Sequence, residues 1–316
     1  MKNMPLRRRT RWALPAALLV ITAATLTACS DDAASSSAKP TAPASTASTA
    51  STASASGAAK LSAGPARRMI DNDGHRLAFH VTPGRLPAIV LDAGGGLDSS
   101  YWKDLVPRLA AATGSEIITY DRAGLGDSDE VPGPWDVKSA VDDLETGLRE
   151  LGVTKDVILV SHSQAGEVAT CFTRANPDTV SGAVLVDANL PEFFTDEEIA
   201  RVVAATTPQV DAAKAGPSTK ESRQLIATAE SYVPVHRAYH QLSWPDGVPV
   251  TVIVSEQTPF AQSPEDAQRW RDAAAAFAKA GPGRTLVTAD GSSHDVPVDR
   301  PDLVLHEIEK MAATRS

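Results

Sequence analysis

The segment Val160-Ser161-His162-Ser163-Gln164-Ala165-Gly166 governs how the whole chain is interpreted. The apolar run 157–160 is typical of a strand buried on both faces, and helical spacing begins at Glu167. A sharp strand-to-helix turn with small neighbours would expose the Ser163 side chain. The helix start would offer the backbone N–H of Gln164 to a developing negative charge. The pattern therefore favours a nucleophilic serine over a serine-rich loop that only caps a helix.

The segments on either side of this turn alternate between short apolar runs and amphipathic stretches. After a hairpin at 69–81, the predicted strands cover 88–91, 116–120, 157–160, 183–186, 250–254 and 285–287. The predicted helices cover 100–112, 137–151, 167–175, 268–280 and 301–311. Such alternation predicts an α/β fold with a mainly parallel sheet and helices on both faces. Its functional site should lie beyond the carboxyl ends of the strands.

The interval 190–248 interrupts this alternation with prolines, helical stretches and several aromatic residues. Long loops without secondary structure are uncommon in compact domains. We therefore expect one α/β domain over residues 65–316, with an inserted helical lid at about 190–248 above the strand ends.

Three more motifs accompany Ser163 along the chain. They are Leu91-Asp92-Ala93-Gly94-Gly95-Gly96, Asp121-Arg122-Ala123-Gly124-Leu125-Gly126-Asp127-Ser128 and Gly291-Ser292-Ser293-His294. Together they resemble the α/β-hydrolase superfamily over about residues 66–313. In that resemblance, 161–165 is a small-residue variant of the G-x-S-x-G nucleophile elbow. The resemblance implies an α/β-hydrolase fold and a serine hydrolase.

The resemblance also implies roles for individual residues. Ser163 would be the nucleophile and His294 its general base, since His294 alone among the seven histidines has the right chain order and a loop at the right end of the sheet. The backbone N–H groups of Gly95 and Gln164 would form the oxyanion hole, although the family usually has His-Gly in the first of these loops. The loop 121–128 would be structural.

The acid of the catalytic triad is left open by the sequence. The family places it after the strand that follows the lid, where this chain has Thr258 instead of Asp. Asp187, at the end of the strand before the lid, is the preferred substitute, and Glu256 is the alternative.

The preferred activity is hydrolysis of carboxylic esters, without a cofactor or a metal ion. A serine in the elbow argues against the dehalogenases and epoxide hydrolases of this fold, which use Asp there. One alternative is a proline-aminopeptidase-like peptidase, which would need an acidic lid residue such as Glu192, Glu197 or Glu198 to bind the substrate amine. The other is a non-catalytic binding protein on the same fold.

The first 28 residues have the layout of a signal peptide, with a basic start, an apolar run at 12–26 and small residues before Cys29. The apolar run is shorter than the roughly 20 residues that span a membrane. Leu26-Thr27-Ala28-Cys29 resembles the lipobox of bacterial lipoproteins, which implies a lipid on Cys29 and an extracytoplasmic, membrane-anchored protein. Export could use the general secretory or the twin-arginine route.

The Ser/Thr/Ala-rich segment 29–64 is expected to be a flexible tether. After cleavage before Cys29, the chain keeps 25 basic and 39 acidic residues, a net charge of −14. A nucleic-acid partner is therefore not expected, and a small ester or amide is the expected substrate. Only Cys171 accompanies Cys29, so no cysteine-based metal cluster is expected.

Overall fold

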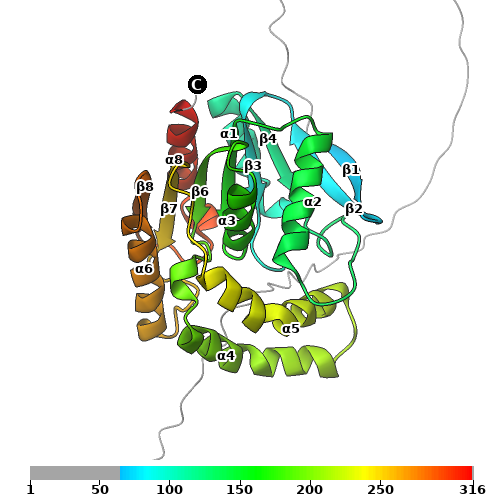
Figure 1. Cartoon of the computed structure of the whole chain (residues 1–316), viewed down its shortest axis with the longest axis vertical. Helices are drawn as coiled ribbons and strands as arrows, with labels where there is room; N and C mark the ends of the chain where they lie inside the picture. Colours follow the sequence, from blue (N-terminus) through cyan, green and yellow to red (C-terminus); the bar gives the residue numbers. More distant parts are fainter. Residues whose placement is uncertain (1–64, 315–316) are drawn as a thin grey trace, which may run out of the picture. The chain divides into compact units, whose positions relative to one another are not determined.

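The computed structural model describes residues 65–314 (Figure 1). The predicted signal peptide, Cys29 and the tether lie outside the described residues. Within 65–314, no helix has both the length and the apolar character needed to cross a bilayer.

The centre of the domain is an eight-stranded sheet with the order β1-β2-β4-β3-β5-β6-β7-β8. Its strands are β1 (Ala66–Asn72), β2 (His75–Thr82), β3 (Arg85–Asp92), β4 (Ser115–Tyr120), β5 (Val157–His162), β6 (Val180–Val186), β7 (Val250–Ser255) and β8 (Arg284–Ala289). The pairs β1–β2 and β2–β4 are antiparallel, and the pairs from β4 onward to β8 are parallel. The predicted mainly parallel sheet is confirmed. The hairpin is confirmed too, with Asp73 and Gly74 at positive φ in its turn.

Helices cover both faces of the sheet (Figure 1). On one face, α1 (Val106–Thr113) and α8 (Pro301–Ala313) bury Leu109, Val304 and Ile308. On the other face lie α2 (Val137–Glu150), α3 (Ala165–Ala175) and α6 (Pro264–Lys279), which bury aliphatic and aromatic side chains. The continuous apolar strands are needed because each central strand is covered on both sides.

The prediction of one helix over 100–112 is wrong. A 3₁₀ turn, η1 (Ser99–Trp102), comes first, and its start is capped by the Asp98 carboxylate, which accepts from the Ser100 N–H at 2.9 Å. Pro107 then lies in the first turn of α1. Because proline lacks the N–H that a continuous helix would need there, the segment divides in two. The short α7 (Val296–Asp299) was not predicted.

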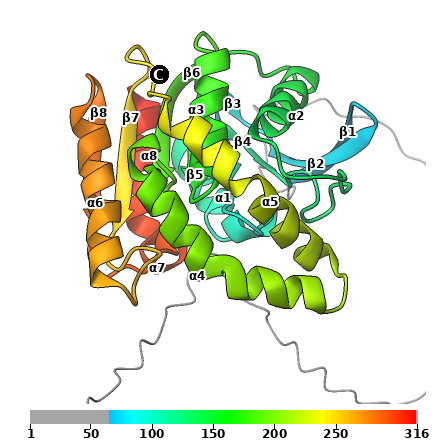
Figure 2. The same cartoon turned by 60° about the horizontal axis from the view of Figure 1, so that its bottom comes forward.

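The chain between β6 and β7, here called the insertion, is helical. It consists of η2 (Pro191–Phe193), α4 (Asp196–Ala215) and α5 (Lys220–His240). Figure 2 shows α4 and α5 packed side by side as a helical pair. Thr195 and Thr219 cap the two helices through their hydroxyl groups. α5 contributes Thr228, Tyr232 and His236 to the cavity that contains Ser163, so the insertion forms one wall of that cavity.

Candidate active site

Ser163 stands at the turn between β5 and α3 with φ +53°, a left-handed conformation that is rare for any residue except glycine. Backbone hydrogen bonds hold this turn in place. The Ser163 N–H donates to the Val186 carbonyl at 3.3 Å, and the Ser163 carbonyl accepts from Gly166 and Asn189 N–H groups at 3.0 and 2.8 Å. The strained turn directs the hydroxyl away from the sheet and into the cavity.

Close packing around the turn explains the small residues of the motif. Ser161 and Ala165 are buried, as expected for the two places that glycine usually takes. The strictest requirement falls one residue later, because a Cβ on Gly166 would lie 2.3 Å from the Asn189 carbonyl oxygen. At this turn glycine is therefore needed at position 166 rather than at 165.

His294 connects Ser163 to a buried carboxylate. Its Nε2 lies 2.9 Å from Ser163 Oγ, and its Nδ1 lies 2.6 Å from Asp187 Oδ2. Because a carboxylate can only accept, Nδ1 carries the proton of the neutral ring. Nε2 is then free to accept the Ser163 hydroxyl proton, which is the arrangement that activates a serine.

Asp187 follows β6, is 1% exposed and has φ +43°. Besides His294, its carboxylate accepts hydrogen bonds from the Ser255 N–H at 2.9 Å, the Ser255 hydroxyl at 2.6 Å and the Trp270 indole N–H at 2.9 Å. Burial alone would raise the pKa of this carboxyl. The hydrogen bond from His294 and the charge that this ring carries when protonated, together with the bonds from Ser255, outweigh burial and lower the pKa.

The geometry brings Asp187, not Glu256, to His294. Glu256 is exposed, and its carboxylate accepts from the Gly291 N–H at 2.6 Å. Thr258, which occupies the family's usual acid position, is buried and donates its N–H to Ser255 Oγ at 2.9 Å. The turn after β7 thus supports Asp187 through Ser255 and does not supply the carboxylate itself.

The glycine-rich loop after β3 is held by Arg122. This buried guanidinium pairs with the Asp92 carboxylate at 2.6 Å and donates to the carbonyl oxygens of Ala93 and Gly94, each at 2.6 Å. In a trans peptide the C=O and N–H groups point in opposite directions. Because the Gly94 carbonyl points to Arg122, the Gly95 N–H of the same peptide points away from it. The loop 121–128, predicted to be structural, therefore orients the loop of the candidate oxyanion donor.

The same glycine loop packs directly on Ser163. A Cβ on Gly94 would lie 3.1 Å from Ser163 Cβ, and one on Gly95 would lie 2.7 Å from the Gln164 side-chain oxygen. Gly95 and Gln164, the two predicted oxyanion residues, both line the cavity with Ser163.

His162 supports the backbone of the histidine loop. Its Nε2 lies 3.0 Å from the His294 carbonyl oxygen, which can only accept, so Nε2 is the donor. Its ring lies between those of Tyr101 and His294, with centroid distances of 4.9 and 4.7 Å. Burial, followed by repulsion from His294 when that ring is protonated, lowers the pKa of His162 to about 3. This ring is therefore neutral at physiological pH.

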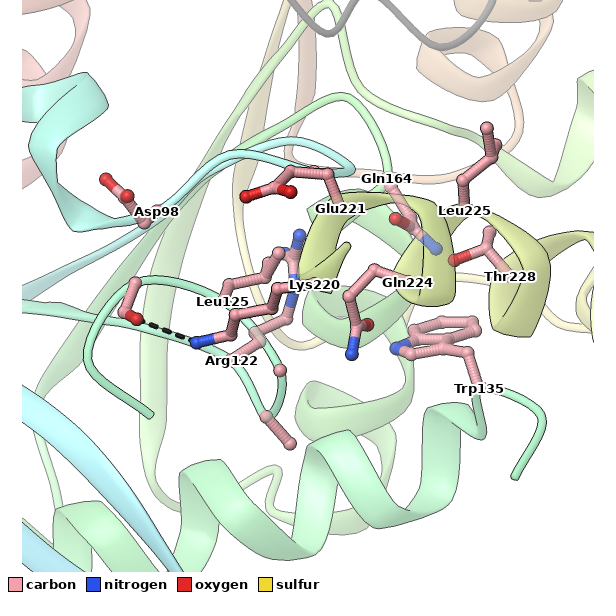
Figure 3. Close-up of a pocket in the computed structure, with 14 residues that line it drawn as sticks. Asp98, Arg122, Leu125, Trp135, Gln164, Lys220, Glu221, Gln224, Leu225 and Thr228 are labelled. Carbon is pink, nitrogen blue, oxygen red and sulfur yellow. Dashed lines mark hydrogen bonds between the residues drawn. The ribbon is translucent and has the colours of Figure 1, made fainter. Parts of the chain in front are cut away.

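The cavity beside Ser163 has a volume of about 310 Å³, and its walls mix apolar and polar side chains. A smaller cavity of about 110 Å³ lies beyond Gln164, which lines both (Figure 3). In it, the Lys220 ammonium donates to the carbonyl oxygens of Gly126 and Ser128 at 2.8 and 3.1 Å. Lys220 thereby ties the start of α5 to the loop 121–128. Within residues 65–314, no group of three or more His, Cys, Asp or Glu side chains is placed to hold a metal ion.

The peptidase alternative would need an acidic residue of the lid, but none of Glu192, Glu197 and Glu198 lines the cavity beside Ser163. Glu197 is exposed and pairs with Arg201 at 2.9 Å, and Glu198 pairs with Arg269 at 3.0 Å. Two other carboxylates line the cavity: Asp295, which accepts from the Tyr101 hydroxyl at 3.3 Å, and Glu167, on the first turn of α3. The sequence does not single out Glu167, because there it is simply the first residue of a predicted helix.

Comparison with known proteins gives a consistent assignment. The alpha/beta hydrolase family matches residues 89–307. The uncharacterized protein YqjL of Bacillus subtilis is 33% identical over 102 residues, which are 32% of this chain and 40% of that protein. The probable esterase D14L of Oryza sativa subsp. japonica is 32% identical over 133 residues, 40% of this chain and 46% of that protein. The chain therefore spans less than half the length of these relatives.

Several solved structures share the fold. An esterase from Thermogutta terrifontis superposes with a TM-score of 0.54 at 22% identity, covering 78% of this chain and 97% of that one. An esterase from Exiguobacterium antarcticum gives 0.58 at 17% identity, covering 78% and 98%. The haloalkane dehalogenase DatA from Agrobacterium tumefaciens gives 0.59 at 14% identity, covering 81% and 99%. The expected α/β-hydrolase fold is confirmed.

Proposed function

The chain belongs to the alpha/beta hydrolase family, and from this premise we propose that it is a serine hydrolase that cleaves carboxylic esters. The observation that carries the proposal is the continuous hydrogen-bonded chain from Ser163 Oγ through His294 to Asp187, at the wall of a cavity of about 310 Å³. The similarity to a probable esterase and to the folds of two esterases supports the same activity.

In the proposed mechanism, His294 Nε2 accepts the Ser163 proton while Oγ attacks the ester carbonyl carbon. The Gly95 and Gln164 N–H groups stabilise the resulting oxyanion. The imidazolium, paired with Asp187, then gives its proton to the leaving alcohol as the C–O bond breaks. A water deprotonated by His294 cleaves the acyl-enzyme and restores Ser163.

Two features favour this reaction over the alternatives. The nucleophile is a serine hydroxyl, whereas a carboxylate is expected at the elbow of a dehalogenase. The lid glutamates that a peptidase would need for an amine lie outside the cavity.

A fluorophosphonate probe tests the proposal, because it labels only serines that have been activated. We expect labelling of the wild type and none of Ser163→Ala, with normal labelling of Ser100→Ala, a matched change at an exposed serine outside the cavity. A wild type that is neither labelled nor active on p-nitrophenyl esters would instead be a binding protein.

We also propose that the protein is exported and anchored to the outer face of a bacterial membrane by a lipid on Cys29. The order of basic, apolar and lipobox-like segments in residues 1–29 supports this. Cys29→Ser should move the protein from the membrane fraction to the soluble fraction. A variant that stays with the membrane would contradict the anchor.

A further inference from the structure

A group of buried and partly buried polar side chains faces the same cavity as Ser163 but has no part in the ester mechanism. Its members, here called the polar cluster, are Glu167 on α3, Asn189 after β6, and Tyr232 and His236 one turn apart on α5. All four line the cavity. The cavity beside Ser163 therefore has a polar wall as well as apolar lining residues.

Two oxygen atoms of the polar cluster have no hydrogen-bond partner among the described residues. Glu167 is fully buried, and its Oε1 accepts from Asn189 Nδ2 at 2.5 Å and lies 3.0 Å from His236 Nε2. Its other oxygen, Oε2, is buried and unpartnered, and so is the Tyr232 hydroxyl. Buried polar atoms are almost always hydrogen-bonded, so two such atoms at one cavity wall indicate a missing partner.

The protons of the cluster can be assigned from donor and acceptor rules. His236 Nδ1 lies 2.7 Å from the Tyr232 carbonyl oxygen, which can only accept, so Nδ1 carries a proton. One further proton lies between Nε2 and Glu167 Oε1. Whether it belongs to the ring or to the carboxyl group, the Glu167–His236 pair has no net charge.

A pair without net charge selects against a charged ligand. An ammonium group placed beside Glu167 Oε2 would bring an unbalanced charge into a buried site, which is strongly unfavourable. A neutral group carries no such penalty. The partner must donate to Oε2, which is an acceptor, and can accept from the Tyr232 hydroxyl. Burial raises the pKa of that phenol well above its ordinary value, so it keeps its proton.

We propose that the polar cluster is a specificity site that binds a hydroxyl group of the ester substrate. The substrate O–H would donate to Glu167 Oε2, and its oxygen would accept from the Tyr232 hydroxyl. This inference rests on the proposed esterase function and names its substrate class, hydroxylated esters. The site is pre-organised, because the His236 ring is packed between Phe194 and Tyr232 at centroid distances of 4.1 and 3.9 Å.

Matched pairs of p-nitrophenyl esters test this inference: butanoate with 3-hydroxybutanoate, and hexanoate with 6-hydroxyhexanoate. The measured quantity is the ratio of kcat/KM for the hydroxylated ester to that for its unsubstituted partner. For at least one pair we expect a ratio of about ten or more in the wild type, because rejecting the hydroxyl-free ester follows from leaving buried polar groups unpaired. The ratio should fall towards one in Glu167→Gln and several-fold in Tyr232→Phe.

Glu192→Gln is the matched control, since Glu192 is a partly buried glutamate of the insertion that does not line the cavity. It should keep the wild-type ratio. If Glu167→Gln does not fold, Tyr232→Phe decides, because it leaves the Glu167–His236 pair intact.

The outcomes separate this inference from the proposed function. Labelling of Ser163 by the fluorophosphonate, together with ratios near one for both pairs, would keep the esterase and overturn the hydroxyl site, leaving water as the partner of the two oxygens. A higher kcat/KM for p-nitrophenyl 6-aminohexanoate than for the 6-hydroxy ester would replace the hydroxyl by an ammonium group. Absence of labelling would overturn both.

Discussion

The indole N–H of Trp270 donates a 2.9 Å hydrogen bond to the buried carboxylate of Asp187. Trp270 belongs to α6 and Asp187 follows β6, so the bond fixes the carboxylate from a direction that neither the elbow nor the histidine loop can supply. The Ser255 N–H donates to the same oxygen, Oδ1, and the Ser255 hydroxyl donates to Oδ2, which also faces His294 Nδ1.

Replacing Asp187 by Asn should lower kcat on p-nitrophenyl esters on the order of a thousandfold or more, because the imidazolium loses its counter-charge and the ring its correct tautomer. Glu256→Gln, which removes a carboxylate that accepts from the Gly291 N–H and does not contact His294, should stay close to the wild type. Steady-state kinetics of both variants check this. A nearly normal Asp187→Asn beside an inactive Glu256→Gln would exchange the two roles.

Arg122→Lys should lower kcat on the order of tenfold or more with a smaller change in KM, because a lysine cannot hold the Ala93 and Gly94 carbonyls together and the Gly95 N–H would lose its orientation. Arg223→Lys is the control, since Arg223 pairs with Glu130 on the surface. Unchanged kcat in a folded Arg122→Lys protein would show that the loop 93–95 holds its shape without the guanidinium.

Gly166→Ala should destabilise the domain by about 1–3 kcal/mol, because the new Cβ would lie 2.3 Å from the Asn189 carbonyl oxygen and the backbone must move. Urea unfolding measures the loss. Gly247→Ala provides the comparison, since a Cβ there meets no atom within 4 Å. Equal free energies of unfolding for the two variants would argue against the tight contact behind the elbow.

His162 should make the domain sensitive to acid. Its pKa falls from 6.5 to about 3 on folding, so between these pH values the unfolded chain binds a proton that the folded one does not. The free energy of unfolding should then rise with pH across this window, by about 1.4 kcal/mol per pH unit from this group. Above the window, the stabilising contribution of the neutral His162 ring is complete. When urea unfolding is measured between pH 4 and 7, the free energy of unfolding should rise less steeply with pH in His162→Gln than in the wild type.

His306→Gln, at an exposed histidine of α8, should keep the wild-type slope. If the free energy of unfolding rises equally steeply with pH in the wild type, His162→Gln and His306→Gln, then His162 takes up its proton in the folded state as it does in the unfolded one.

Local signals explain what the sequence could predict. The strands, the hairpin and the turn at Ser163 depend on residues close together in the chain, and they could be identified from periodicity and motif spacing. The break at Pro107 was missed because apolar spacing continues through it, although the proline itself was the available signal. The catalytic roles of Ser163, His294, Gly95 and Gln164 stay predictions that the kinetic tests address.

Long-range geometry explains the rest. The sequence offered Asp187 and Glu256 as acids, and only the neighbouring positions of β6 and β7 in the sheet show which carboxylate reaches His294. The polar cluster was not predicted because Glu167 and His236 are 69 residues apart and meet only where α5 folds back over α3. No motif spacing indicates such a contact.

The neutral Glu167–His236 pair also limits how substrate preference at this wall could be redesigned. A single replacement of either partner would strand its neighbour as an isolated ionisable group in the interior. A variant adapted to plain aliphatic chains would thus have to change both positions together, for example to Leu and Phe. Stepwise adaptation at this wall would have to pass through a damaged intermediate, so coordinated replacement is the more accessible route for protein engineering.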